Sequence, residues 1–255
     1  MDIKSSTELL WEGLQQNQHF PEELQGQLAL EEGYQIQLAV LDKWLAAGEE
    51  QAGWKLAFTA PGPRKMFGAE VPGHGYVLDR GRKSTGTHFD FDGMNNPAVE
   101  VELLMTVNQP LAGPGVTVER VREVLCSITP GFEIIERRGD MASDLPLGVA
   151  DNIFHSAYVA GGVVSPVPNF FSPETVTVEI SRNGELFQKS VGADVIDNHY
   201  ENIAFLANRL GAFGRRIEPG QVLLTGSFIP PTPASKGDHW VAKYEGLGEV
   251  ELHFD

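Results

Sequence analysis

Short apolar runs separated by glycine and proline fill the sequence from Gly53 to the C-terminus. Runs of this kind, rich in β-branched and aromatic residues, are typical of β-strands. The expected strands are Trp54–Phe58, Gly75–Leu78, Val99–Val107, Phe132–Ile135, Ala157–Ala160, Thr175–Ile180, Leu186–Ser190, Val222–Leu224, Trp240–Tyr244 and Glu249–Phe254. Because helical patterns do not alternate regularly with these strands, a doubly wound parallel sheet is not expected.

Helical patterns occupy the first fifth of the chain. Ser5 or Ser6 is expected to cap a first helix. A second helix is expected to open at Pro21 and to end at Gly48, since its apolar residues recur every three or four positions. Residues 1–50 carry ten acids and two bases. We therefore expect an N-terminal helical segment with an acidic, solvated surface.

The remainder of the chain predicts a β-rich unit. Two further helices are expected at Val118–Cys126 and Tyr200–Leu210, and Asn183-Gly184 is a strong hairpin turn. This irregular mixture favours an α+β fold. We expect a mixed β-roll or barrel core in residues 51–255, preceded by the helical segment in residues 1–50.

Composition narrows the possible functions. A net charge of −16 would repel a duplex phosphate backbone, so nucleic-acid binding is not expected. No apolar run approaches the roughly 20 residues of a membrane helix, so no membrane partner is expected. The N-terminus lacks the pattern of a signal peptide. The single cysteine, Cys126, excludes an internal disulfide and favours a reducing, cytoplasmic location.

Two glutamates share one face of an expected strand. Alternate residues of a strand project to the same side, so Glu100 and Glu102 lie together, opposite an apolar face. Their face continues with Leu104 and is therefore not simply exposed to solvent. Neighbouring carboxylates in such a place need a cation or a proton, and Mg²⁺ or Mn²⁺ with oxygen ligands meets that need. The alternative is an amphipathic strand with an exposed polar face.

Glu133 lies among apolar residues in a second expected strand. A buried acid needs a partner. With Glu100 and Glu102 it would form a three-carboxylate site suited to Mg²⁺ or Mn²⁺, with positions left for water or substrate. The alternative is a surface acid at a strand edge, paired with one of the arginines that follow.

Several other residues could contribute chemistry. Lys55 lies between two apolar residues, and it either extends into solvent or points its ammonium into a site. His74 lies in a glycine-rich turn, where an exposed loop histidine is the alternative to a functional one. His155 lacks the spacing of a histidine metal site. Thr225 stands at a strand end, as a substrate contact or as part of a turn. Asp151-Asn152 is expected to tie loops together by hydrogen bonds.

Several short motifs of this sequence occur in the order that is typical of a known protein family. They are Glu32–Gln37, Gly53–Leu56 followed by Thr59, Glu100-x-Glu102 followed by Glu133, Val149–Asn152, Leu223–Gly226 and Tyr244–Val250. In this order they resemble the 2-keto-4-pentenoate hydratase / 4-oxalocrotonate decarboxylase family of the fumarylacetoacetate hydrolase superfamily, over nearly the whole chain. The resemblance implies that Glu100, Glu102 and Glu133 bind Mg²⁺ or Mn²⁺ and that Lys55 is an active-site lysine. It also implies a homo-oligomer with a mixed β-roll core.

The resemblance further implies a lyase of aromatic compound catabolism. Its small-molecule substrate would be a 2-oxo or 2-hydroxy unsaturated carboxylic acid, that is, an α-keto acid or its enol. A hydratase of the 2-hydroxypenta-2,4-dienoate type, working through an enolate stabilised by the metal, is the first expectation. The alternatives are a decarboxylase of the 4-oxalocrotonate type, a C–C hydrolase of acylpyruvates, and an inactive assembly partner of an active subunit.

The sequence departs from the family at the substrate wall. Hydratases of the family usually carry a proton-transferring Asp at the position of Gly73, and decarboxylase members commonly lack it as well. The usual Ala-Ser after the Asp-Asn pair is Ile153-Phe154 here. We therefore expect a histidine to supply proton transfer if the chain is a hydratase. The catalytic candidates are Lys55 and His74, and the candidate substrate contacts are Leu104, His155 and Thr225.

Overall fold

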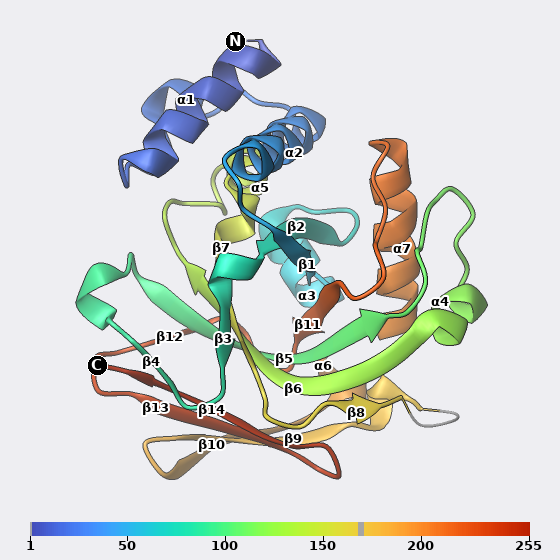
Figure 1. The fold of residues 1–255 in the computed structure, drawn as a ribbon. Coiled ribbons are helices and arrows are strands. Elements are labelled where there is room, and N and C mark those ends of the chain that lie inside the picture. The colour runs from blue at the N-terminus through green and yellow to red at the C-terminus, as the bar shows by residue number, and fades with distance from the viewer. Residues whose placement is uncertain (1, 168–170) are drawn as a thin grey trace.

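The computed structural model describes residues 2–167 and 171–255, and its core consists of two packed sheets (Figure 1). The strands of the larger sheet are β1 (Gln51–Ala57), β2 (Gly73–Leu78), β3 (Arg82–Ser84), β5 (Pro97–Val107), β6 (Leu125–Glu136), β7 (His155–Ala160), β8 (Ser165–Pro166), β11 (Val222–Ser227) and β12 (Thr232–Pro233). Those of the smaller sheet are β4 (Thr87–Phe89), β9 (Thr177–Arg182), β10 (Glu185–Val191), β13 (His239–Tyr244) and β14 (Gly248–Phe254).

Both sheets mix strands that are distant in sequence. The larger runs β2-β1-β11-β5-β6-β7-β3, with β12 paired to β5 and β8 paired to β6. The smaller runs β10-β9-β13-β14-β4. Both paths have free ends within the described ranges. The predicted α+β class with a rolled, mixed core is therefore confirmed, whereas the core is not a closed barrel.

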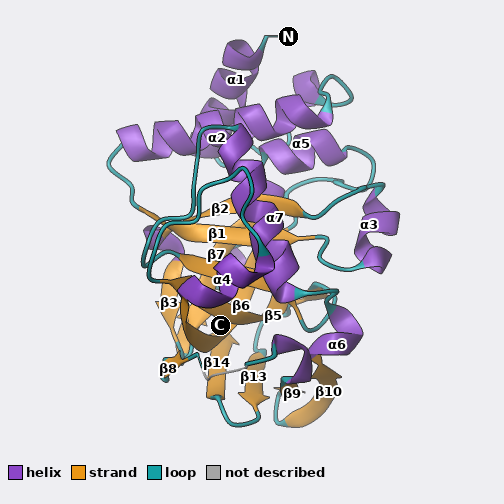
Figure 2. Cartoon of the chain, turned by 90° about the vertical axis from the view of Figure 1, so that its right-hand side faces the viewer, coloured by secondary structure: helices purple, strands orange, loops and turns teal. Residues whose placement is uncertain are grey.

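Helices cover the larger sheet at one end and along one side. The α-helices are α1 (Ile3–Gln15), α2 (Leu30–Ala46), α3 (Pro61–Phe67), α4 (Val118–Val124), α5 (Leu145–Ala150), α6 (Gly192–Val195) and α7 (His199–Ala212). Short 3-10 helices are η1 (Glu22–Leu24), η2 (Asp79–Gly81), η3 (Phe91–Gly93), η4 (Asn152–Phe154) and η5 (Pro173–Thr175). In Figure 2, α1, α2 and α5 lie above the edge formed by β2 and β1, and α4 and α7 lie together beside the sheet. None of the described helices is long and apolar enough to cross a membrane.

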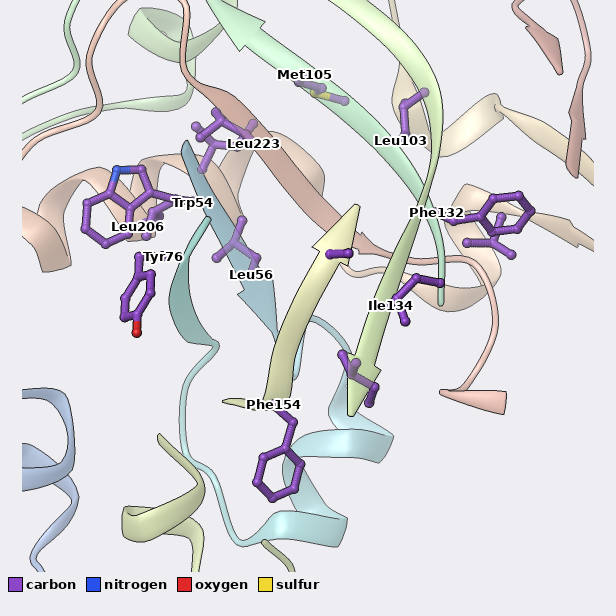
Figure 3. Packing of buried hydrophobic residues seen from close by; sticks show 14 of the residues in the cluster. Trp54, Leu56, Tyr76, Leu103, Met105, Phe132, Ile134, Phe154, Leu206 and Leu223 are labelled. Carbon is purple, nitrogen blue, oxygen red and sulfur yellow. The ribbon is translucent and has the colours of Figure 1, made fainter. Parts of the chain in front are cut away.

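The two central strands explain how the functional face is oriented. Val101, Leu103 and Met105 are fully buried on one face of β5, where they join Phe132 of β6 in the main core. Figure 3 shows Leu103, Met105 and Phe132 in this core. Burying side chains of this size stabilises the fold by about 1.5–3 kcal/mol each. A slip of one residue would expose this whole set, so the register of β5 is strongly fixed. The alternate residues of β5, including its glutamates, therefore face the other way.

Three sequence predictions of helix ends need correction. The first helix is capped by Asp2, whose carboxylate accepts a hydrogen bond from the amide of Ser5 at 2.9 Å, rather than by a serine. The second helix begins at Leu30, because the chain turns at Gly26 with φ +67° after the single turn of η1. The helix expected to reach Cys126 ends at Val124, since the following residues pair with β5.

The predicted hairpin turn is confirmed. Asn183 and Gly184 join β9 to β10 with φ values of 56° and 81°, the left-handed pair that a tight hairpin requires. The division into segments 1–50 and 51–255 stays a prediction. Apolar residues of α2 share the main core with Trp54 of β1.

Candidate active site

Glu100 and Glu133 lie directly opposite each other on β5 and β6, and Glu102 lies opposite Gly131. Opposed residues of adjacent strands project to the same side of a sheet, as do residues two apart on one strand. The three carboxylates therefore share one face of the larger sheet. Glu102 and Glu133 are each 1% exposed, and Glu100 is partly buried.

Lys55 reaches the same face from β1. Its Nζ donates hydrogen bonds to Glu133 Oε1 at 2.7 Å and to the carbonyl oxygen of Ile153 at 2.9 Å. The two charged side chains are 2% and 1% exposed. Of the two interpretations open for Lys55, the geometry matches the inward one. One of its three N–H donors is left for a ligand.

An unusual turn presents the carbonyl of Ile153 to Lys55. Asn152, Ile153 and Phe154 have φ values of 55°, 46° and 61°. Left-handed backbone costs roughly 1–3 kcal/mol at a non-glycine residue and is rare for a β-branched one. Asn152 holds the turn, because its side chain donates to the carbonyl of Tyr76 at 2.9 Å and accepts from the amide of Tyr76 at 2.8 Å.

The acid that precedes this turn is also fixed. Asp151 accepts hydrogen bonds from Arg138 Nε and Nη2, both at 3.0 Å, and is 1% exposed. Together with the contacts of Asn152 to β2, these bonds confirm that Asp151-Asn152 ties loops together. The sequence predicts this linking role of Asp151-Asn152, but it does not predict the left-handed turn that follows.

His155 completes the surroundings of Glu133. Its Nδ1 lies 2.8 Å from Glu133 Oε1, the oxygen that also accepts from Lys55. Burial lowers the pKa of His155, although the bond to Glu133 opposes that effect. The ring is therefore neutral near pH 7, with Nδ1 donating to the carboxylate and Nε2 left as an acceptor. Within the described part of the chain, Nε2 has no hydrogen-bond partner.

The three glutamates differ in protonation. Burial raises the pKa of Glu100 to about 8, and the nearby charge of Glu133 adds to this. Burial, Glu133 and Glu100 together raise the pKa of Glu102 well above its usual value. Burial would also raise the pKa of Glu133, but Lys55 and His155 outweigh it and lower that pKa. Lys55 thus keeps Glu133 ionised, whereas Glu100 and Glu102 favour their protonated forms without a further cation. A hard divalent cation with oxygen ligands would stabilise the ionised forms of these two glutamates.

Glu102 is held from two sides. Its Oε2 accepts a hydrogen bond from the amide of Gly226 at 2.9 Å, and its carbonyl oxygen accepts from the hydroxyl of Tyr244 at 2.6 Å. Gly226 has φ +121°, and a Cβ there would lie 2.5 Å from Thr59 Oγ1. Only glycine fits this position. Gly226 and Tyr244 belong to motifs of the resemblance, but the sequence does not reveal their contacts with Glu102.

The glutamates do not form a closed ligand shell in this structure. In the described ranges, the ligand atoms that all lie within 4.8 Å of one another belong to His239, Glu251 and His253 on the smaller sheet. Glu133 Oε1 instead points toward Lys55 and His155. The assignment of Glu100, Glu102 and Glu133 as metal ligands stays a prediction, supported by their shared face.

The candidate substrate contacts lie in different surroundings. Leu104 is 3% exposed and belongs to a small apolar cluster on the carboxylate face. The cluster comprises Val77, Leu104, Tyr158, Val222 and Leu224. Thr225 is fully buried, and its hydroxyl donates to the carbonyl of Leu103 at 2.8 Å. The hydroxyl of Thr225 is therefore bonded to the backbone of β5 and not to one of the three carboxylates.

For His74, a catalytic candidate from the sequence, the structure contradicts the alternative of an exposed loop histidine. His74 is fully buried in β2 and stacks on Tyr34 with ring centroids 4.5 Å apart. It lies opposite Leu56, whereas Gly75 lies opposite Lys55, so the ring is on the other face of the sheet from the carboxylates. Burial lowers the pKa of His74 to about 3. The geometry therefore does not support a catalytic role for His74.

Gly73 is on the same side as Lys55, where family hydratases were expected to carry an Asp. A Cβ at Gly73 would lie 2.9 Å from the ring carbon Cδ2 of Phe58 and 3.1 Å from Cδ1 of Ile153. The place of the missing side chain is therefore filled by apolar groups.

Comparison with known proteins places this arrangement in a family. The model of the fumarylacetoacetate (FAA) hydrolase C-terminal family matches residues 79–254, and the chain belongs to that family. The chain is 30% identical to a 2-hydroxyhexa-2,4-dienoate hydratase of Comamonas testosteroni, over 89% of this chain and 87% of the relative. It is 28% identical to a 4-oxalocrotonate decarboxylase of Pseudomonas sp. (strain CF600), over 88% and 84%. These relatives confirm the predicted family and the predicted lyase class.

Comparison with solved structures gives the same family and fold. The 4-oxalocrotonate decarboxylase from Pseudomonas putida G7, complexed with magnesium and adipate, superposes with a TM-score of 0.92 at 25% identity, covering 99% of this chain and 98% of that one. A fumarylpyruvate hydrolase from Pseudomonas aeruginosa, in complex with Mn²⁺ and pyruvate, has a TM-score of 0.63 at 15% identity, covering 80% and 89%. The second likeness shows the fold alone.

Proposed function

We propose that this chain is a divalent-metal-dependent lyase acting on 2-oxo or 2-hydroxy unsaturated carboxylic acids, with Glu100, Glu102 and Glu133 as ligands of Mg²⁺ or Mn²⁺. The observation that carries the proposal is the shared face of the three carboxylates, one of which, Glu133, forms an ion pair with Lys55. A similar solved decarboxylase is complexed with magnesium and with the dicarboxylate adipate. A 2-oxo acid offers comparable oxygen donors to a metal at this face.

Different residues of the site would bind the substrate, transfer protons and exclude water. A bound cation would stabilise the negative charge that develops as the substrate becomes an enolate. Lys55 has one free N–H donor for a substrate oxygen, since Glu133 and Ile153 occupy the other two. The neutral His155 presents Nε2 as a proton acceptor beside Glu133. Leu104 and its apolar neighbours would exclude water from the hydrocarbon part of the substrate.

A hydratase of the 2-hydroxypenta-2,4-dienoate type is the first assignment, because several relatives carry hydratase names. A 4-oxalocrotonate-type decarboxylase is the second. The observation that favours it is that apolar groups of Phe58 and Ile153 occupy the place beside Gly73 where family hydratases would carry a proton-transferring Asp. Decarboxylation adds no water, so it does not require a carboxyl group at this place.

Product analysis tests the assignment. The purified protein is incubated with Mg²⁺ or Mn²⁺ and either 2-hydroxypenta-2,4-dienoate or its carboxylated homologue, and dienol absorbance and CO₂ are followed. Water addition without CO₂ release supports the hydratase, and CO₂ release supports the decarboxylase. Cleavage of an acylpyruvate alone would replace the lyase with a C–C hydrolase. Absence of turnover on all substrates, with metal bound, would leave an inactive assembly partner.

We also infer a homo-oligomer that acts in the cytoplasm. The family resemblance supports the oligomer, and a single cysteine, Cys126, fits a reducing compartment. Light scattering after size-exclusion chromatography tests the first point, since a monomeric mass at working concentration would contradict it. Fractionation of the source cells tests the second.

A further inference from the structure

Three histidines form a row across the smaller sheet. His253 of β14 lies opposite His88 of β4 on one side and opposite His239 of β13 on the other. The His88 and His253 rings stack with centroids 4.4 Å apart, and the His239 and His253 rings with centroids 4.1 Å apart. Because opposed residues share a face, all three imidazoles project from the same side of the sheet.

This row lies on the outer face of the sheet. Leu252 and Phe254, the neighbours of His253 in β14, are buried in the core, so His253 points the opposite way. The side chains of His239 and Glu251 are 36% and 45% exposed. A solvated ion could therefore reach these groups without any opening of the fold.

A carboxylate completes the set of donors. Glu251 precedes His253 by two residues in β14 and shares its face. Its Oε2 lies 2.8 Å from His239 Nε2, and one ligand atom each of His239, Glu251 and His253 lies within 4.8 Å of the others. Ligand atoms around a tetrahedral Zn²⁺ are roughly 3.3 Å apart, given Zn–N and Zn–O distances near 2.0–2.1 Å. Small rotations of exposed side chains cover the difference.

We propose that His239, Glu251 and His253 form a second metal site, which binds a borderline divalent ion such as Zn²⁺, with His88 beside it as a fourth donor. Imidazole nitrogens favour Zn²⁺, Ni²⁺ and Cu²⁺, whereas Mg²⁺ and Ca²⁺ favour oxygen ligands. His88 Nδ1 lies 3.0 Å from both carboxylate oxygens of Asp255, which orients its ring and leaves Nε2 free to bind. The site is on a different sheet from the three glutamates and does not depend on the proposed enzymatic function.

Zinc titration in the presence of saturating Mg²⁺ tests the proposal, because Mg²⁺ competes at the carboxylates and not at imidazoles. The full chain, stripped of metal, is titrated with Zn²⁺ by calorimetry, and with Co²⁺ while its visible spectrum is recorded. We expect a single Zn²⁺ per chain and a tetrahedral Co²⁺ spectrum. His253→Gln and Glu251→Gln should each weaken Zn²⁺ binding by on the order of tenfold or more.

Lys243→Gln is the matched control, since Lys243 is exposed on the same face of β13 and lacks a place among the donors. It should bind Zn²⁺ like the wild type, as should Glu102→Gln. Thermal unfolding in chelator checks that each variant folds, and His239→Gln replaces any that does not. No Zn²⁺ binding in excess Mg²⁺ would overturn the proposal. So would binding that survives His253→Gln, or binding that is lost in Glu102→Gln alone.

Discussion

The ammonium of Lys55 lies 2.7 Å from Glu133 Oε1, and both side chains are almost completely withdrawn from water. This pair neutralises Glu133 but leaves Glu100 and Glu102 without a cation of their own. Replacing a buried pair by apolar residues is often tolerated, whereas removing one partner is strongly destabilising. The pair therefore links the stability of the fold to the charge of the candidate active site.

Lys55→Met should remove most activity and also destabilise the protein. Glu133 would keep a buried charge with only His155 beside it, which costs about 3 kcal/mol of unfolding free energy. In the wild type, the lowered pKa of Glu133 means that its contribution to stability is present above its ordinary pKa and is lost as the pH falls. Without Lys55 the pKa of Glu133 rises. The difference in unfolding free energy between the wild type and the variant should therefore shrink as the pH falls toward about 5.

Urea unfolding at several pH values measures the loss of unfolding free energy in Lys55→Met. The double variant Lys55→Met/Glu133→Gln is the control, because it removes both charges and should recover much of the stability at neutral pH while staying inactive. Wild-type stability and turnover in Lys55→Met would contradict the importance of the ion pair.

Glu102→Gln should lower Mg²⁺-dependent turnover by on the order of a hundredfold while the fold remains intact. The amide keeps an oxygen that can accept from the amide of Gly226, and it removes a carboxylate whose burial raises its pKa. Stability without metal should therefore stay equal or increase. Glu249→Gln, at an exposed position of β14, is the control and should leave both activity and melting temperature unchanged.

Glu100 predicts a pH dependence of stability. Its pKa is raised from 4.5 to about 8 in the fold, so the native state binds more protons than the unfolded state between these values. The free energy of unfolding therefore falls with rising pH because of this group, and Glu100→Gln should become progressively more stable than the wild type across that window. Added Mg²⁺ should remove this advantage. Parallel stability profiles of the two proteins without metal would refute the assignment.

Sequence patterns predicted the carboxylate face because strand alternation and the apolar neighbours of Glu133 are local features. They could not place His74, since its burial depends on the pairing of β2 with β1 and on the ring of Tyr34, which is remote in the sequence. The left-handed turn at Ile153 opposes the local preference of isoleucine, and distant bonds from Asn152 hold it. Local patterns indicated the longer strands but not the short strands β3, β4, β8 and β12, and contacts across the fold decide these site details.

The two histidines near the site should respond differently to substitution. His155→Gln removes the imidazole that donates to Glu133, so kcat should fall by about tenfold or more. His74→Gln lies on the other face of the sheet and should alter stability, with kcat of the folded fraction unchanged. Steady-state kinetics, corrected for the folded fraction by circular dichroism, separates these effects. A larger loss of kcat in His74→Gln than in His155→Gln would reverse the assignment.

Gly73→Asp tests whether Phe58 and Ile153 occupy the space that a side chain at position 73 would need. The new Cβ would lie 2.9 Å from Phe58 Cδ2 and 3.1 Å from Ile153 Cδ1, so the single variant should lose about 1–3 kcal/mol of stability. Ile153→Ala removes one of these contacts, and the double variant Gly73→Asp/Ile153→Ala should be more stable than the sum of the single effects. Urea unfolding measures the coupling.

The same double variant probes the reaction. A carboxyl group introduced at position 73, on the same side of the sheet as Lys55, should raise the rate of water addition relative to CO₂ release, since it can pass a proton to or from water. Product ratios for a dienoate and its carboxylated homologue report this change, and Ile153→Ala alone is the control for the enlarged space. Strictly additive stabilities would show that Ile153 does not fill the place of the missing carboxyl group. Unchanged product ratios would show that the carboxyl group at this place does not decide between the two reactions.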